Sequence, residues 1–175
     1  ETLEGYLSTA PGQHFFHRSG WGVGRIRNID ASTGMIRIDF AEKADHQMPV
    51  NGIHGLLAPV PHDHFMVRVA FDRDALKVEA KSEPLGVIKT FLRDRPNQTA
   101  DLKEIKKYFI GPVVTKTEWT SWWAAARKRA KEDVYVAISS GTNPKLELRA
   151  SEVNPAQELV DSIKPIFLPA RTLAM

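Results

Sequence analysis

Residues 18–40 read RSGWGVGRIRNIDASTGMIRIDF, and this stretch decides the fold of the first part of the chain. Apolar and polar residues alternate along 25–29 and again along 35–40, as they do in strands with one buried face. Between them, DASTG (30–34) has the composition of a turn. The stretch therefore predicts an antiparallel β-hairpin.

The three glycines of this stretch, Gly20, Gly22 and Gly24, have two interpretations. A phosphate-binding glycine loop follows a strand and opens a helix, whereas these glycines lead into a strand. The spacing also matches neither the dinucleotide-binding fingerprint nor a P-loop. We therefore expect a structural role, in which the glycines permit a bulge or a sharp bend.

Two further strands are expected around the hairpin. Phe15 and Phe16 indicate a short strand before it, and DHQMPV (45–50) indicates another after it, with Pro49 near its end or on a sheet edge. Several short strands in so few residues are typical of a small SH3-like or Tudor-like barrel.

The rest of the chain has mainly helical periodicity. GIHGLLAPV (52–60) reads as a short helix or turn that Pro59 and Pro61 end. Residues 63–72, with Asp63 as a possible cap, fit either a helix or a strand, and a helix is favoured. Further helices are expected at 83–94, at 99–109 with Thr99 as a cap, and at 117–133 with Thr117 as a cap. VYVAIS (134–139) and KLELRA (145–150) predict a second hairpin, and a last helix is expected at 156–164.

The order helix, helix, helix, hairpin is typical of a winged helix, with 117–133 as its third helix and 134–149 as its wing. The predicted fold class is thus α+β: a small SH3/Tudor-like β-barrel followed by a winged-helix-like helical domain with a β-hairpin wing. The predicted parts are a barrel at 12–60, a helical connector at 61–82, a winged-helix-like domain at 83–150, and a C-terminal helix and tail at 151–175.

Composition excludes several classes of protein. The chain has 175 residues with 42% apolar and 26% charged residues, which is ordinary for a globular protein. It has no cysteine, which removes disulfides, thiolate catalysis and cysteine-based zinc sites. No apolar run approaches the ~20 residues that span a bilayer, and no signal peptide is recognisable. We expect a cytoplasmic protein; a first residue of Glu1 in place of methionine is typical of a piece of a longer chain.

The formal net charge is only +3, but basic residues cluster in ARKRAK (126–131). Arg127, Lys128, Arg129 and Lys131 are the predicted nucleic-acid contacts, because the third helix of a winged helix enters a groove and cations bind the phosphate backbone. The alternative is a solvated helix end whose positive charge complements the helix dipole.

The same helix carries Trp119, Trp122 and Trp123 at helical spacing, which favours a core role for them. One of the adjacent pair must point away from the buried stripe, and that side chain is a candidate anchor for a partner.

Signals for catalysis and metal binding are weak. His62 and His64 form an H-x-H pair, and His14 and His17 lie close in sequence, but no further ligands follow at a recognisable spacing. There is no HExxH motif, no G-x-S-x-G elbow and no evident carboxylate pair, although a dyad could assemble in three dimensions. We expect no enzyme activity, no cofactor, no metal and no small-molecule substrate.

Residues 17–50, with Trp21, Gly22, Val23 and Gly24 feeding a strand, resemble the Tudor-like domain shared by CarD-type regulators and transcription-repair coupling factors. The resemblance implies docking on the β subunit of RNA polymerase by the edge of the small barrel. Trp21, Arg25, Arg27 and Arg37 are then the expected polymerase contacts.

The combination of this segment with LLAPVPHDHFMVRVAFD (56–72), EPLGVIKTFL (83–92) and EWTSWWAAARKRAKEDVYVAIS (118–139) resembles the N-terminal region ahead of the Gre domain in long Gre-type elongation factors. Gre factors stimulate transcript cleavage with acidic residues at the tip of a long coiled coil, and no such pair of helices is recognisable here. The resemblance therefore implies polymerase binding without cleavage stimulation.

Three functional hypotheses follow. The first is a non-catalytic RNA polymerase-binding module of a transcription elongation factor, with a basic helix near DNA. The second is a winged-helix nucleic-acid binder without polymerase docking, whose affinity would fall steeply with salt. The third is an enzyme whose site the sequence does not reveal.

Overall fold

The computed structural model describes residues 10–154 and residue 157. The chain divides into two compact units, with the division between Ser82 and Glu83. The predicted connector (61–82) holds two helices and lies in the first unit. The predicted helix at 156–164 lies outside the described residues.

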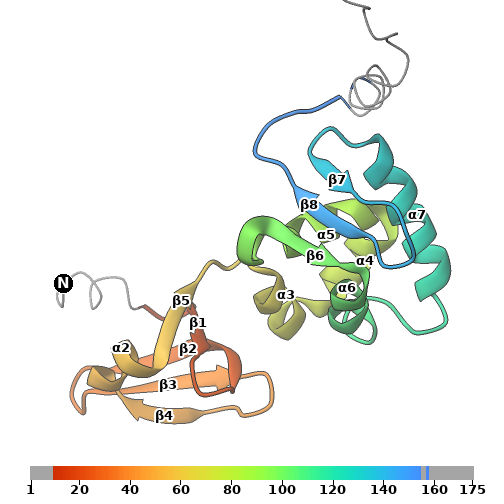
Figure 1. Ribbon diagram of the computed structural model, residues 1–175. Helices are drawn as coiled ribbons and strands as arrows, with labels where there is room; N and C mark the ends of the chain where they lie inside the picture. Colours follow the sequence, from red (N-terminus) through yellow and green to blue (C-terminus); the bar gives the residue numbers. More distant parts are fainter. Residues whose placement is uncertain (1–9, 155–156, 158–175) are drawn as a thin grey trace, which may run out of the picture. The chain divides into compact units, whose positions relative to one another are not determined.

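The first unit is built on an antiparallel sheet in the order β4-β3-β2-β1-β5 (Figure 1). Its central hairpin is the predicted one, with a turn at 31–34 between the two long strands. The strands are β1 (His14–His17), β2 (Gly22–Asp30), β3 (Met35–Phe40), β4 (His46–Pro49) and β5 (Leu57–Val60).

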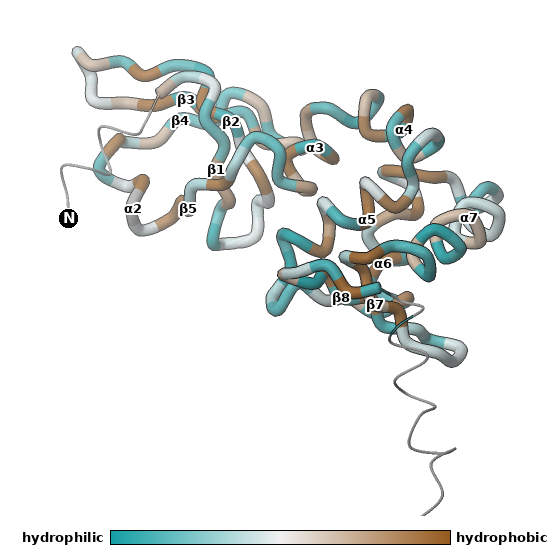
Figure 2. Tube along the Cα trace, turned by 90° about the horizontal axis from the view of Figure 1, so that it is seen from above, coloured by the Kyte–Doolittle hydropathy of each residue, from teal (hydrophilic) through white to brown (hydrophobic). Residues whose placement is uncertain are grey.

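Alternation along these strands places one face in the core. Ile26, Ile36 and Ile38 are almost completely buried, whereas the neighbouring Arg25 and Arg37 are exposed. Figure 2 shows the corresponding change between hydrophobic and hydrophilic positions along the chain. The buried cluster on the sheet consists of Phe15, Ile26, Ile36, Ile38, Phe40, Met48, Ile53 and Leu57.

The predicted closed barrel differs from the described sheet, which is open. Its two edge strands, β4 and β5, are not paired with each other in the described residues. For residues 52–60, the predicted short helix is present, but a strand follows it that was not predicted. A short 3-10 turn (Val50–Gly52) and the one-turn helix α2 (Ile53–Leu56) are followed by β5, which pairs with β1. Pro59 lies inside that strand, which is possible because β5 is an edge.

The bulge expected at the glycines lies instead between Ile26 and Asn28, where the β2–β3 register shifts. Gly22 has a φ of +73°, a conformation that other residues rarely adopt. Gly24 is required for space, since a Cβ there would lie 2.6 Å from Phe40 Cε1. The glycines therefore serve a turn and a close strand approach.

Two helices complete the first unit, α3 (Phe65–Phe71) and α4 (Arg73–Ser82). The expected helix at 63–72 is confirmed. Its N-cap is His64 in place of the expected Asp63, and His64 Nδ1 accepts a hydrogen bond of 3.1 Å from Met66 N.

The second unit combines helices with a three-stranded antiparallel sheet in the order β6-β8-β7. Its elements are α5 (Pro84–Arg93), a 3-10 turn (Pro96–Gln98), β6 (Thr99–Asp101), α6 (Leu102–Phe109), α7 (Trp119–Glu132), β7 (Val136–Ile138) and β8 (Lys145–Leu148). The three predicted helices and the second hairpin are confirmed, and β6 is an additional strand.

Aromatic rings join the three helices of the second unit. The Phe109 ring lies 5.4 Å from that of Phe91 on α5 and 5.3 Å from that of Trp122 on α7, measured between ring centroids. Since all three side chains are buried, one aromatic cluster fixes α5, α6 and α7 around a common core.

Both helix caps predicted for the second unit were wrong. Asp101 caps α6 in a reciprocal box with Glu104, while Thr99 lies in β6. Before α7, Thr115 and Glu118 make the reciprocal pair. Glu118 N donates to Thr115 Oγ1 at 3.2 Å, and Thr115 N donates to Glu118 Oε2 at 3.1 Å. In both cases the pair joins a short polar side chain to a glutamate three residues further on, which is the spacing of a capping box.

Candidate partner-binding and nucleic-acid surfaces

Trp21 is a large apolar side chain held at the surface of the first unit. It is 42% exposed, yet its ring stacks on His17 at 4.7 Å and meets His46 edge-on at 4.5 Å. The Lys43 ammonium lies 4.4 Å from the centre of the same ring. These contacts fix the orientation of the indole before any partner arrives, which is what an anchor residue requires.

The side chains around His46 lower its pKa. Its pKa lies below the ordinary value of 6.5 because of burial first, and then because of the nearby charges of Lys43 and His17. The neutral imidazole is therefore the form that the folded unit favours beside Trp21.

The three predicted arginine contacts fall at two places. Arg27 Nε lies 2.9 Å from Asp39 Oδ2, and Arg37 Nη1 lies 3.4 Å from Asp45 Oδ2. Asp45 also lies 3.8 Å from Arg27, so both arginines share one carboxylate. Arg25 is placed apart from them, with its guanidinium 5.2 Å from the ring of Phe71 on α3.

The carboxylates of this network are organised by the backbone. Asp45 N donates a 2.9 Å hydrogen bond to Asp39 Oδ1, and this bond is the main reason why the pKa of Asp39 is lowered. Burial opposes the shift, and the Arg27 side chain adds to it. Arg27 and Arg37 remain about half exposed, at 52% and 49%. They can exchange their internal partners for carboxylates of another protein with little change in solvation.

A groove beside Trp21 was not predicted from the sequence. We call it the Trp21 groove; its volume is about 440 Å³. It is lined by the Trp21 loop and strand ends (Gly20, Trp21, Gly22, Val23, Phe40, Ala41, Glu42, Lys43) and by the helical residues Met66, Val69, Ala70 and Arg73. These residues come together only because α3, 23 or more positions further along the chain, packs against the end of the sheet. No local sequence pattern predicts that contact.

The tryptophans of α7 behave as expected. Trp119 and Trp122 are buried, and Trp123 is the member of the pair that leaves the buried stripe. Trp123 is half-buried and stacks on Trp119, with ring centroids 6.0 Å apart and an interplanar angle of 6°.

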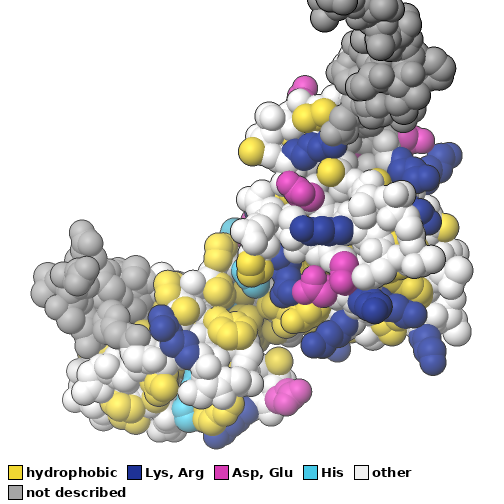
Figure 3. Space-filling model, in the orientation of Figure 1, with side chains coloured by type: hydrophobic (Ala, Val, Ile, Leu, Met, Phe, Trp, Pro, Cys, Tyr) yellow, Lys and Arg dark blue, Asp and Glu magenta, His cyan; other side chains and the backbone are white. Residues whose placement is uncertain are grey.

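The four predicted nucleic-acid contacts on α7 have different surroundings. Arg129 Nη1 is paired with Glu83 Oε2 at 2.8 Å. Arg127 is half-buried, and its Nε has no hydrogen-bond partner among the described residues. Lys128 and Lys131 are exposed. On the face drawn in Figure 3, Lys and Arg side chains of this unit are spread out with Asp and Glu among them.

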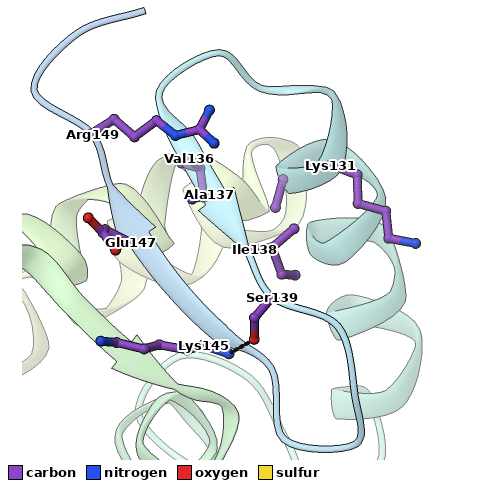
Figure 4. A pocket seen from close by; sticks show the side chains of 9 residues that line it. Lys131, Val136, Ala137, Ile138, Ser139, Lys145, Glu147 and Arg149 are labelled. Carbon is purple, nitrogen blue, oxygen red and sulfur yellow. Dashed lines mark hydrogen bonds between the residues drawn. The ribbon is translucent and has the colours of Figure 1, made fainter. Parts of the chain in front are cut away.

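Lys131 borders a hollow of about 420 Å³ between the end of α7 and the β7–β8 hairpin. We call it the hairpin hollow. It adds two cations that sequence analysis missed, Lys145 and Arg149, with Glu147 between them (Figure 4). Arg149 reaches across the end of β7, whereas Lys145 and Lys131 extend in other directions. Separated cations of this kind suit a chain of phosphates better than one small anion.

The two histidines of the H-x-H pair, His62 and His64, were weighed as metal ligands in the sequence. His64 is a helix cap, and within the described range no three His, Asp or Glu side chains gather as a metal ion would need. In the same range, no helix is both long enough and apolar enough to cross a bilayer.

Comparison with known proteins gives a family and several relatives. The model of the GRAD helix-turn-helix domain matches residues 66–153. A protein named transcription elongation factor GreA from Chlamydia pneumoniae is 31% identical over 135 residues, which cover 77% of this chain. The GreA of Chlamydia trachomatis is 29% identical over 140 residues, or 79% of the chain.

A putative GreA-associated domains protein from Treponema pallidum is 27% identical over 163 residues, which cover 93% of this chain. The matched segments make up only 18%, 19% and 24% of these three relatives, in the order given. No solved structure matches the chain significantly. Since the family model covers residues 66–153, half of the sequence, the chain belongs to the GRAD helix-turn-helix domain family.

Proposed function

We propose that this chain is a non-catalytic RNA polymerase-binding module of a transcription elongation factor. The observation that carries the proposal is the match of 77–79% of the chain to proteins named transcription elongation factor GreA. The segment matched in those proteins is a minor part of their length, which suits an accessory module.

The proposed docking surface is the exposed face of the first sheet. This sheet would be the CarD-like, Tudor-like part of the chain. Arg25, Arg27 and Arg37 project from neighbouring strands, and Trp21 is a preoriented apolar anchor at the end of β2. Arginine and tryptophan are residue types enriched in interface hot spots, and here strands and a strand end hold them at exposed positions. The proposed partner is the β subunit of bacterial RNA polymerase in the cytoplasm. A short strand of that subunit would pair with the edge strand β4, which lies next to the β3 strand that carries Arg37.

The test is retention of the full 175-residue chain by immobilised bacterial RNA polymerase. Changing Arg25→Glu together with Arg27→Glu should abolish retention. Lys103→Glu with Lys106→Glu makes the same charge change on exposed positions of α6 and should leave retention unchanged.

Arg27→Glu also places a carboxylate beside Asp39, so Arg25→Ala with Arg27→Ala is the milder variant, and circular dichroism checks its fold. Wild-type protein that does not bind polymerase, or arginine variants that bind as well as it does, would refute the proposal.

A second candidate function is nucleic-acid binding by the winged-helix-like second unit. It is favoured by the exposed Lys128 and Lys131 on α7 and by Lys145 and Arg149 around the hairpin hollow. Duplex DNA binding should weaken steeply between 50 and 200 mM salt, by roughly tenfold or more for several phosphate contacts. Lys128→Glu with Lys131→Glu should remove it, and equal DNA binding by that variant would eliminate this candidate.

A further inference from the structure

The Trp21 groove has an apolar floor of the size of one or two large side chains. Val23 and Phe40 form it from the sheet, and Met66 and Val69 form it from α3. Trp21 forms a wall, exposed at 42% although its ring is fixed by neighbouring rings. A well-formed apolar concavity beside an exposed aromatic residue is the usual place for a partner's anchor side chain.

The rim of the groove carries positive charge without internal compensation. Arg27, Arg37 and Arg68 of the same unit each pair with a carboxylate. On the rim, Lys43 lies over the Trp21 ring, and Arg73 Nε donates to the carbonyl oxygen of Val69 at 3.2 Å.

No described carboxylate pairs with Lys43 or Arg73. Glu42 is the single acidic residue that lines the groove, and it pairs with neither of them. The rim is thus prepared to receive carboxylates from outside the unit.

We propose that the Trp21 groove binds an extended peptide segment in which a large apolar side chain is flanked by acidic residues. The apolar side chain would occupy the floor between Phe40 and Met66, and the carboxylates would meet Lys43 and Arg73. The inference rests on the proposed function at Trp21, for which it specifies the chemistry of the bound segment.

A nucleic acid suits this groove less well than a peptide. Binding a phosphate backbone uses a row of cations, whereas this rim has two cations with Glu42 beside them and an apolar floor below. A peptide buries the floor and neutralises the rim in one contact.

The test is fluorescence anisotropy with the full chain and a fluorescein-labelled peptide of sequence EDELFDED. We expect saturable binding at low salt. The peptide EDEAADED keeps the charge and removes the anchors, and KRKLFKRK keeps the anchors and reverses the charge. Neither should bind saturably.

Variants of the chain test separately how the floor and the rim of the Trp21 groove contribute to peptide binding. Lys43→Glu with Arg73→Glu should weaken EDELFDED binding by about tenfold or more, because two attractions become repulsions. Lys77→Glu with Lys81→Glu makes the same charge change at two α4 positions that do not line the groove, and binding should stay within about twofold of wild type. Ala70→Leu fills the floor from α3 and should block the peptide while circular dichroism shows an intact fold.

The inference is overturned if EDEAADED binds as well as EDELFDED, or if Lys77→Glu with Lys81→Glu weakens binding as much as the rim variant. It is also overturned if Ala70→Leu binds normally, or if an oligonucleotide and not the peptide saturates the groove.

The peptide assay contains no polymerase, so it tests this inference separately from the proposed function. Loss of polymerase retention with intact peptide binding would therefore refute the proposed function alone, and the reverse result would refute this inference alone.

Discussion

At the scale of single residues, Gly24 shows how closely two strands approach in the first unit. A Cβ on this residue would lie 2.6 Å from Phe40 Cε1 and 2.7 Å from Ile38 Cγ2, both of which belong to buried side chains. Gly24→Ala should therefore lower the free energy of unfolding by about 1–3 kcal/mol, the cost of overpacking a core. Urea denaturation measures the change.

Gly55→Ala is the matched control, since nothing lies within 4 Å of a Cβ there. Gly55 is in α2, where alanine is the better helix former, so this variant should be neutral or slightly more stable. A Gly24→Ala protein as stable as Gly55→Ala would contradict the close approach.

Two histidines make the stability of the first unit depend on pH. Burial is the first cause that lowers the pKa of His14 and of His46 below 6.5, followed by Arg25 at His14 and Lys43 at His46. The unfolded chain therefore takes up protons at a higher pH than the folded chain. The free energy of unfolding should fall as pH drops below about 6.5 and through the lowered pKa values.

His14→Gln with His46→Gln should flatten the dependence between pH 7 and pH 5, as measured by thermal unfolding against pH. The same slope in wild type and variant would show that other groups cause it.

Trp21 was named from the resemblance of the glycine-rich stretch to a known family. The exposure of Arg25, Arg27 and Arg37 could be predicted, because exposed strand positions follow from alternation. The ion pairs of Arg27 and Arg37 with Asp45 could not be predicted, because they depend on the β3–β4 turn.

At the scale of elements, α6 depends on a cap that the sequence analysis misplaced. Glu104 N donates a 2.8 Å hydrogen bond to Asp101 Oδ1, and Asn143 Nδ2 donates to Asp101 Oδ2 at 3.1 Å. Asp101→Ala should lower the free energy of unfolding by about 1–2 kcal/mol. Thr99→Ala, at the position first expected to cap, should cost clearly less in the same thermal denaturation series; equal costs would argue against the cap.

The tryptophans of α7 should differ in a predictable order. Trp122 is buried between Phe109 and Trp119, so Trp122→Ala should cost about 3–5 kcal/mol. Trp123 contacts Trp119 in one half-buried stack, and Trp123→Ala should cost about 1 kcal/mol. Chemical denaturation of the two variants decides the order, and a larger cost at Trp123 would reverse the assignment of the buried face.

Elements with a clear periodic pattern could be predicted, and β5 and β6 could not. The β2–β3 hairpin and α5, α6 and α7 have patterns that repeat over several turns or pairs. β5 has only LAPV, in which proline speaks against a strand, and β6 has three residues directly before a helix. Both are strands because they pair with a strand distant in sequence, β1 for β5 and β8 for β6. No local pattern therefore predicts them.

At the scale of the whole molecule, the two units should unfold separately. Each has its own buried cluster, and their division falls between Ser82 and Glu83. Gly24→Ala should shift one unfolding transition and Trp122→Ala the other, as followed by calorimetry. A single transition that both variants shift equally would show that the units unfold together.

The family match begins at residue 66, inside the first unit, and so includes α3 and α4. The α3 residues Met66, Val69 and Ala70 line the Trp21 groove. Sequence analysis treated 61–82 as a connector, because a short helix carries no sign of what it packs against. The groove could not be predicted for the same reason.

Proline has a particular distribution in the first sheet. The inner strands β1, β2 and β3 have none, whereas the edge strands β4 and β5 contain Pro49 and Pro59. An open sheet edge can template the growth of fibrils, because each added copy leaves a fresh row of N–H and C=O groups. Proline interrupts that row, so these two edges should resist polymerising with further copies of the sheet.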